Sequence, residues 1–158
     1  MLIYGEPRLT QDIDITLGID SRDFQKLSRM AAQLSLIILV ENPEHFVKQC
    51  MVLPTRDKKT GIRVEFIFSN SLYEKQAMER VKKIKIGSTV VSFASLEDLV
   101  IHKLIAGRPR DIEDIKGILL RNAKYDKSYV RKWLLEFDKS LEQGYSALLV
   151  EIKRDLKR

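Results

Sequence analysis

Two aspartates near the start of the sequence alternate with large aliphatic residues. The run Asp12-Ile13-Asp14-Ile15-Thr16-Leu17 has the period of two that predicts a half-buried strand. The side chains of Asp12 and Asp14 then project from one face, about 6.5–7 Å apart. Two negative charges at this spacing repel each other, and acidic residues are uncommon in strands, so the pair calls for a cation. We expect Mg²⁺ or Mn²⁺, because these metals prefer carboxylate oxygens as ligands.

The residues just before this strand carry groups that suit phosphate. Gly5 permits a close approach of the backbone, and Arg8 offers a rigid fork of donors that fits a phosphate. The hydroxyl of Thr10 can orient a carboxylate or a water molecule. These three residues favour metal and phosphate chemistry over the alternative, which is a solvated acidic face on an edge strand.

This segment resembles a known signature. Gly5-Glu6-Pro7-Arg8-Leu9-Thr10-Gln11-Asp12-Ile13-Asp14 is similar to the Gly-x-x-Arg-x-Thr-x-Asp-Ile-Asp motif of polymerase-β-like nucleotidyltransferases. Within that superfamily it resembles the abortive-infection (type IV toxin) branch and its uncharacterised relatives. The resemblance implies transfer of a nucleoside monophosphate from an NTP to a hydroxyl acceptor, with Asp12 and Asp14 as metal ligands.

A third acid stands on a later strand, expected over residues 62–68. Its apolar residues alternate with Arg63, Glu65 and Ile67, so Glu65 lies on the face opposite the aromatic side chains. If this strand neighbours the first, Glu65 can face the two aspartates. Val64-Glu65-Phe66 resembles the third motif of the same family, which implies that Glu65 is a catalytic metal ligand. The alternative is a surface glutamate paired with Arg63.

A second polar cluster follows the strands. Lys103 comes four residues after Leu99 on an expected helix, so it borders the buried face of that helix. Asp111 and Asp114 stand one turn apart on the next helix. A carboxylate in the first turn of a helix stabilises it by about 0.3–1 kcal/mol, which gives Asp111 a structural explanation.

The segment from Lys103 to Asp114 also resembles the downstream motif of the abortive-infection branch, a helical lysine followed by Arg-Asp-x-x-Asp. The resemblance implies that Lys103 neutralises the triphosphate, with Arg8 or Arg110 assisting. Asp111 and Asp114 would hold these cations in place, and Asp114 could instead touch the nucleotide. Gly5 and Thr10 complete the implied nucleotide-binding set.

The helices and strands that must position these residues are predicted from hydrophobic periodicity and from turn and capping residues. Helices are expected over 22–34, 43–49, 71–80, 96–106, from 109 onward, 128–137 and 141–156, and further strands over 36–40, 50–55, 81–86 and 89–93. Serines are the expected helix N-caps, at Ser21, Ser71, Ser95 and Ser128.

Together these elements predict an α/β (α+β) fold. It has a mixed, mostly antiparallel nucleotidyltransferase-type sheet with helices packed on it and a helical C-terminal part. We expect a nucleotidyltransferase-like catalytic domain over residues 1–94 and a helical region over residues 95–158.

The family's first motif, a Gly-Gly or Gly-Ser pair at the head of a helix, binds nucleotide phosphates through backbone N–H groups. The sequence has no counterpart of it. Either the sequence starts at an internal methionine, or the protein lacks this phosphate cradle. The second case leads to an alternative function, a catalytically idle binding module for a partner protein or nucleic acid. A metal-dependent nuclease is a further alternative, but the cluster around Lys103 does not support it.

The net charge, the cysteine count and the apolar runs of the sequence indicate which partners and which compartment to expect. The net charge of +6 over 158 residues favours polyanions, although abundant Lys and Glu are also common on thermophile surfaces. The expected partners are an NTP, an RNA or protein acceptor, and a cognate toxin or antitoxin protein. One cysteine allows no internal disulfide, and no long apolar run predicts a membrane helix or signal peptide. We therefore expect a cytoplasmic protein.

Overall fold

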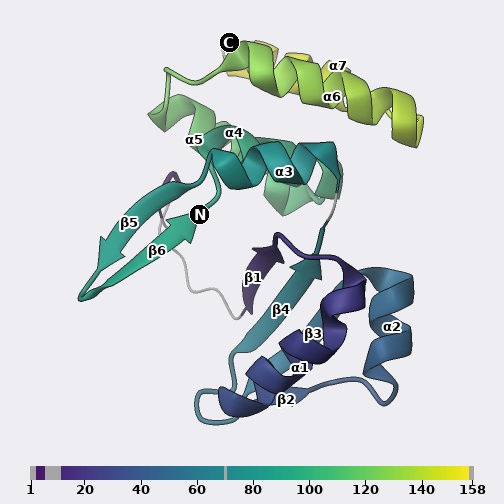
Figure 1. Ribbon diagram of the computed structural model, residues 1–158. Coiled ribbons are helices and arrows are strands. Elements are labelled where there is room, and N and C mark those ends of the chain that lie inside the picture. Colours follow the sequence, from purple (N-terminus) through teal and green to yellow (C-terminus); the bar gives the residue numbers. More distant parts are fainter. Residues whose placement is uncertain (1–2, 6–11, 70, 157–158) are drawn as a thin grey trace. The chain divides into compact units, whose positions relative to one another are not determined.

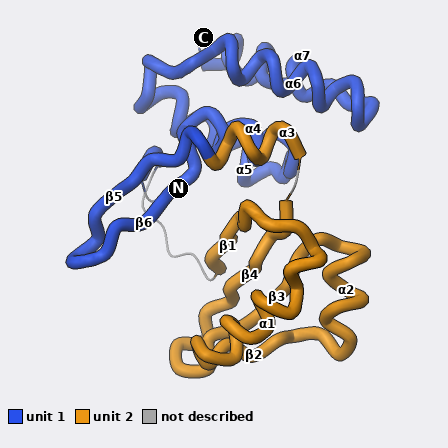
Figure 2. The backbone as a smooth tube through the Cα atoms, viewed as in Figure 1, with its two compact units in different colours: residues 1–8, 79–158 blue, residues 9–78 orange. Residues whose placement is uncertain are grey.

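The computed structural model describes residues 3–5, 12–69 and 71–156 (Figure 1). In chain order the elements are β1 (Asp12–Leu17), the 3-10 turn η1 (Ser21–Asp23), α1 (Phe24–Gln33), β2 (Leu36–Ile38), α2 (Pro43–Cys50), β3 (Val52–Asp57), β4 (Arg63–Phe68), α3 (Leu72–Glu79), β5 (Lys82–Ile86), β6 (Thr89–Phe93), α4 (Leu96–Ala106), α5 (Pro109–Arg121), α6 (Lys127–Leu141) and α7 (Tyr145–Asp155). The chain divides into two compact units, residues 9–78 and residues 1–8 with 79–158 (Figure 2). The α/β prediction is confirmed.

The unit of residues 9–78 contains a four-stranded sheet in the order β1-β4-β3-β2. β1 runs parallel to β4, and the other neighbours are antiparallel, so the sheet is mixed and mostly antiparallel, as predicted. Helices α1 and α2 lie against the sheet in Figure 1. Their apolar side chains form one core with those of β3 and β4: Phe24, Leu27, Val47, Leu53, Val64, Phe66 and Phe68.

Strand β4 alternates as the sequence predicts. Val64, Phe66 and Phe68 are buried, and the residues between them are exposed or half-buried. The buried Thr55 hydroxyl on β3 donates to the Val64 carbonyl at 2.7 Å, which satisfies a polar group inside the core. This alternation fixes Glu65 on the face opposite the core.

The first residues of strand β1 are more exposed than the half-buried strand that the sequence predicts. Ile13 and Ile15 are 48% and 37% exposed, whereas Leu17 packs against the core. The physical reason is that β1 lies at the edge of the sheet, where β4 is its neighbour among the described strands. The Ser69 hydroxyl donates to the Leu17 carbonyl at 2.7 Å and so secures the end of β1 beside the end of β4.

The other unit combines a hairpin with a helical bundle. β5 and β6 pair through the predicted two-residue turn, where Gly87 has a φ of 60° that suits glycine. Helix α4 packs against α5, α6 and α7. The buried side chains of these four helices include Val100, Ile101, Leu104, Ile115, Ile118, Val130, Leu134, Leu149 and Ile152. The predicted helical C-terminal part is therefore confirmed, and none of the described helices has the length and apolar content to cross a membrane.

Two helix starts differ from prediction. Asp20, and not Ser21, accepts the hydrogen bond that caps the first turn. Asp126 caps α6 by accepting the Tyr129 N–H at 2.9 Å, while Ser128 donates to the same carboxylate. In both places an aspartate precedes the predicted serine, and an ionised cap bonds more strongly than a neutral hydroxyl.

The other two serine caps are confirmed. Ser71 accepts the Glu74 N–H at 3.2 Å, and Ser95 accepts the Asp98 N–H at 3.1 Å. The last two helices also divide differently from the prediction. α6 continues to Leu141, and α7 begins at Tyr145, whose N–H donates to the Asp138 carboxylate at 2.6 Å.

Candidate functional site

Three predicted acids share one face of the sheet. Asp14 on β1 is the register partner of Glu65 on β4, and Asp12 is the partner of Arg63. Paired residues on neighbouring strands project from the same face, with strands about 4.8 Å apart. The condition set by the sequence, that the strand of Glu65 neighbours the strand of Asp12 and Asp14, is therefore met.

The same face holds a cation. Arg63 Nη2 lies 2.6 Å from Glu65 Oε1, and the two side chains are 49% and 30% exposed. Thus Glu65 both faces the aspartates and pairs with Arg63, so the two interpretations of this residue coexist. A surface pair of this kind contributes about 0.2–1 kcal/mol, so it does not fix the glutamate against a stronger ligand.

The carboxylates of this face suit a hard divalent metal, which takes oxygen ligands. Within residues 3–5, 12–69 and 71–156, however, no group of three His, Cys, Asp or Glu side chains is placed so that it could hold a metal ion. The donor chemistry and the shared face fit Mg²⁺. Convergence on an ion requires side-chain rotations, beginning with Glu65 turning away from Arg63.

The second cluster joins α4 to α5 through an almost buried lysine. Lys103 Nζ donates to Asp111 Oδ1 at 2.9 Å and to Asp114 Oδ2 at 2.6 Å. The three side chains are 11%, 4% and 11% exposed, respectively. As predicted, Lys103 borders the buried face, and both aspartates lie on one side of α5.

The turn between the two helices makes this contact possible. Gly107 has a φ of 61°, and its N–H donates to the Lys103 carbonyl, which ends α4. Pro109 then begins α5, where a missing N–H costs nothing. One tight turn therefore brings the end of α4 back beside the first two turns of α5.

Arg108 completes the cluster from the solvent side. Its Nε donates to Asp111 Oδ2 at 2.6 Å, and its side chain is 75% exposed. Burial raises the pKa of Asp111, but the hydrogen bonds and charges of Lys103 and Arg108 outweigh it, so this pKa lies below its usual value. Two cations and two carboxylates thus meet here, and Asp111 bridges both cations.

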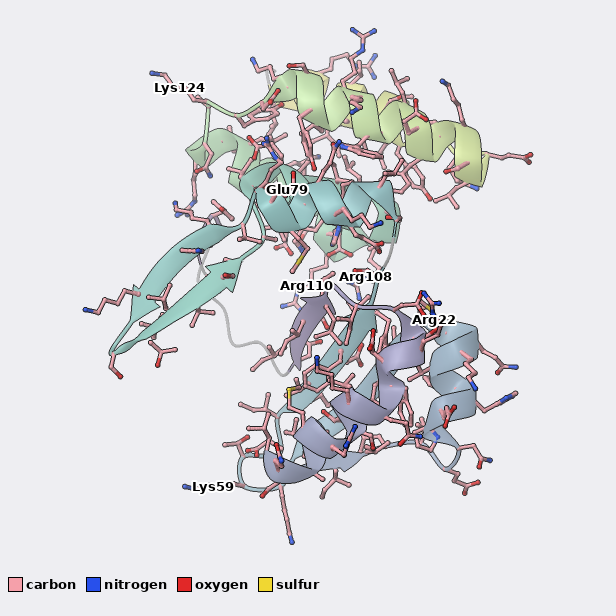
Figure 3. The ribbon with its side chains drawn as sticks, in the orientation of Figure 1. Arg22, Lys59, Glu79, Arg108, Arg110 and Lys124 are labelled. Carbon is pink, nitrogen blue, oxygen red and sulfur yellow. The ribbon has the colours of Figure 1, made fainter. Side chains whose placement is uncertain are left out.

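The remaining predicted site residues are Arg110, Gly5, Arg8 and Thr10. Arg110 is exposed on the first turn of α5, two residues after Arg108 (Figure 3). Gly5 lies in a bend, and Arg8 and Thr10 fall outside the described residues. Their assignment to a nucleotide site stays a prediction.

Asp111 has two cationic partners, of which the sequence predicted Lys103 but not Arg108. The expected arginine was Arg110, whereas Arg108 stands three residues before Asp111. Spacing of three or four residues places side chains on one helix face, so this spacing was the available signal. Asp98 was not among the predicted site residues. It is a 1% exposed carboxylate that accepts hydrogen bonds from Ser95 Oγ and, at 2.8 Å, from the Tyr129 hydroxyl.

Comparison with protein families gives a match over more than half of the chain. Residues 68–153 match the family described as nucleotidyltransferase of unknown function (DUF6036). The chain belongs to this family. The matched region includes Lys103, Asp111 and Asp114, and it begins after Glu65. No curated protein matches the chain.

Proposed function

We propose that this family member is a metal-dependent nucleotidyltransferase that moves a nucleoside monophosphate from an NTP to a hydroxyl acceptor. The observation that carries the proposal is the pairing of Asp14 with Glu65, beside Asp12, on one sheet face. A nucleotidyltransferase family and an open face with three acids support the same chemistry.

Phosphoryl-type transfer needs positioning and charge neutralisation more than covalent help. The acceptor oxygen bonds to the α-phosphorus, the bond from that phosphorus to the bridging oxygen breaks, and pyrophosphate leaves. Asp12, Asp14 and Glu65 would hold Mg²⁺ or Mn²⁺, which when bound neutralises the phosphates and favours loss of the hydroxyl proton. Glu65 is also the residue expected to help receive that proton.

The role we assign to Lys103 is to neutralise triphosphate charge. An ammonium group has three N–H donors, and the described contacts use two of them, to Asp111 and Asp114. The two carboxylates therefore hold the amine in one place and leave one donor for a phosphate. Arg108, with a largely exposed side chain, and Arg110 add positive charge at the start of α5.

The resemblance of two separate segments to the abortive-infection branch further supports a role as a toxin–antitoxin component. In that case the acceptor is an RNA end, a protein or a small molecule, and a cognate regulator protein is the expected partner. The net charge of +6 favours a polyanionic acceptor.

The test is incorporation of α-³²P-labelled NTPs with MgCl₂, with total RNA and a protein lysate offered in turn as acceptors. Asp14→Asn should lose activity by about 100-fold or more, because it removes a metal ligand while keeping the side-chain volume. Asp23→Asn, an exposed aspartate of the same unit, is the matched control and should keep it. Equal activity of the wild type and Asp14→Asn would refute the assignment.

One observation favours a second candidate, an idle binding module. Glu65 is paired with Arg63 in the structure, as a purely structural glutamate would be. Calorimetry with ATP and MgCl₂ separates the two functions. Heat of binding that disappears in Asp14→Asn supports the transferase, and no binding by the wild type supports the module.

A further inference from the structure

The unit of residues 1–8 and 79–158 carries a surface hollow of about 490 Å³ that none of the roles above uses. Its wall is assembled from Tyr4, the start of β5, the start of α4 and the loop after α5. The hollow contains three cations, Arg80, Lys82 and Lys124, and one carboxylate, Glu97. Its lining therefore has an excess of positive charge.

The carboxylate is already engaged. Glu97 Oε2 lies 3.3 Å from Arg80 Nη2, and Glu97 Oε1 accepts the Asp126 N–H at 2.8 Å. These contacts balance the negative charge of Glu97 within the wall. The positive charges that remain uncompensated in the hollow are those of the two lysines.

Both lysines have ammonium groups available to a ligand. Neither Lys82 nor Lys124 pairs with a carboxylate of the described residues, and both are exposed. Lys82 Nζ lies 5.5 Å from the centre of the Tyr4 ring, and Lys124 extends outward from the loop after α5 (Figure 3). The two reach the hollow from segments that are far apart in the sequence.

Arg80 is held in place by an aromatic ring and an ion pair. Its guanidinium stacks over the Tyr129 ring at 4.0 Å, and its Nη2 lies 3.3 Å from Glu97 Oε2. A guanidinium has five N–H donors in a rigid fork that matches phosphate oxygens. Stacking fixes the fork, so little side-chain entropy is lost when it binds an anion.

We propose that the hollow formed by Arg80, Lys82 and Lys124 binds a phosphate group of a nucleotide or of a nucleic-acid strand. A cluster of one fixed guanidinium and two lysines is the chemistry that phosphate requires. The volume of the hollow falls within the range of about 300–1,000 Å³ that small-ligand sites occupy. The proposal concerns binding alone, so it stands or falls independently of the transferase reaction.

The strand β5 offers a matched control. Lys83 and Lys85 alternate with Lys82, so they project from the other face of the hairpin and do not line the hollow. They too are exposed and pair with no carboxylate among the described residues. Replacing them removes the same amount of charge from the same element.

The experiment compares Lys82→Ala/Lys124→Ala with Lys83→Ala/Lys85→Ala in the full chain. Binding of a short fluorescein-labelled single-stranded RNA is followed by anisotropy at several salt concentrations. The variant of the hollow should bind about tenfold more weakly, and the slope of log K against log salt should fall by about 1.4, or about 0.7 for each phosphate contact. The control variant should stay within about twofold of the wild type.

Two competitors identify the source of the phosphate. If AMP or inorganic pyrophosphate displaces the RNA, the site takes a free phosphate compound, and if only unlabelled RNA displaces it, the site takes a strand. Equal weakening in both double variants would show diffuse attraction and overturn the proposal. So would a wild type that binds none of the probes.

Discussion

Lys103 and Asp114 form a nearly buried ion pair, with 2.6 Å between Nζ and Oδ2 and each side chain 11% exposed. The pair connects α4 to α5 across the turn at Gly107. Ion pairs in such positions cost desolvation, and they are a weak source of net stability. Removing only one member of such a pair is costly, because the buried charge that remains loses its opposite charge.

Lys103→Met should therefore destabilise the protein by about 3–5 kcal/mol, because it removes the ammonium group that both nearly buried carboxylates, Asp111 and Asp114, share. Urea unfolding followed by circular dichroism measures the loss. Lys116→Met is the matched control, since Lys116 lies 3.5 Å from Asp155 with both side chains more than a third exposed. That pair should contribute at most about 1 kcal/mol. Similar losses in the two variants would contradict the buried-pair explanation.

Protonation of Asp111 should lower the stability of the folded protein at acidic pH. Burial raises the pKa of Asp111, but the bonds and charges of Lys103 and Arg108 lower it more, so it titrates below its usual value in the folded protein. The stabilisation is therefore complete above the usual value of about 3.9 and is lost as the pH falls through the folded pKa. The unfolding free energy of the wild type minus that of Asp111→Asn should stay level above about pH 5 and shrink as the pH falls below about 4 towards the lower folded pKa. A difference that stays constant would contradict this.

Metal binding should raise the melting temperature through Glu65. A ligand that binds only the folded state stabilises it by about 2.7 kcal/mol at a concentration 100 times its dissociation constant. MnCl₂ should therefore raise the melting temperature of the wild type more than that of Glu65→Gln. Glu41→Gln, an exposed glutamate of the same unit, is the control and should respond like the wild type.

Arg63 provides an independent check on the same face. Its pairing with Glu65 competes with metal, so Arg63→Gln should tighten Mn²⁺ binding about threefold to tenfold, by releasing Glu65 and removing a like charge. Lys59→Gln, in the loop between β3 and β4, makes the same change of charge and should have little effect. Weaker Mn²⁺ binding in Arg63→Gln would show that the arginine supports the site.

Gly107, in the turn before α5, and Gly117, within α5, should respond to alanine with opposite signs. Gly107 has a φ of 61°, where a side chain costs about 1–2 kcal/mol, so Gly107→Ala should destabilise. Gly117 lies within α5 with open space where a Cβ would stand, so Gly117→Ala should stabilise by about 0.5–1 kcal/mol. Urea midpoints of the two variants measure both effects. Destabilisation by both would mean that α5 tolerates no added methyl group.

The sequence predicted what local periodicity controls. The alternation of β4 placed Glu65 opposite Phe66, and the spacing of Asp111 and Asp114 placed them together on α5. The parallel pairing of β1 with β4 depends on tertiary packing, so the sequence could state it only as a condition.

The misses have local causes. Asp20 and Asp126 took the caps expected at serines, because several nearby side chains compete for the same N–H groups. Arg108 reached Asp111 although Arg110 is nearer in the chain, because the helix turns neighbouring residues to different sides. The basic hollow combines segments from Tyr4 to Lys124, and no sequence window contains it.

The pairing of Asp14 with Glu65 also has a consequence for synthesis of the protein. The ribosome makes the two aspartates first, and β4, the strand that neighbours β1 among the described residues, is made about fifty residues later. A nascent or prematurely terminated chain that ends before Arg63 carries both aspartates but lacks Glu65. Translation therefore delays assembly of the acidic face until the hairpin of β3 and β4 has emerged.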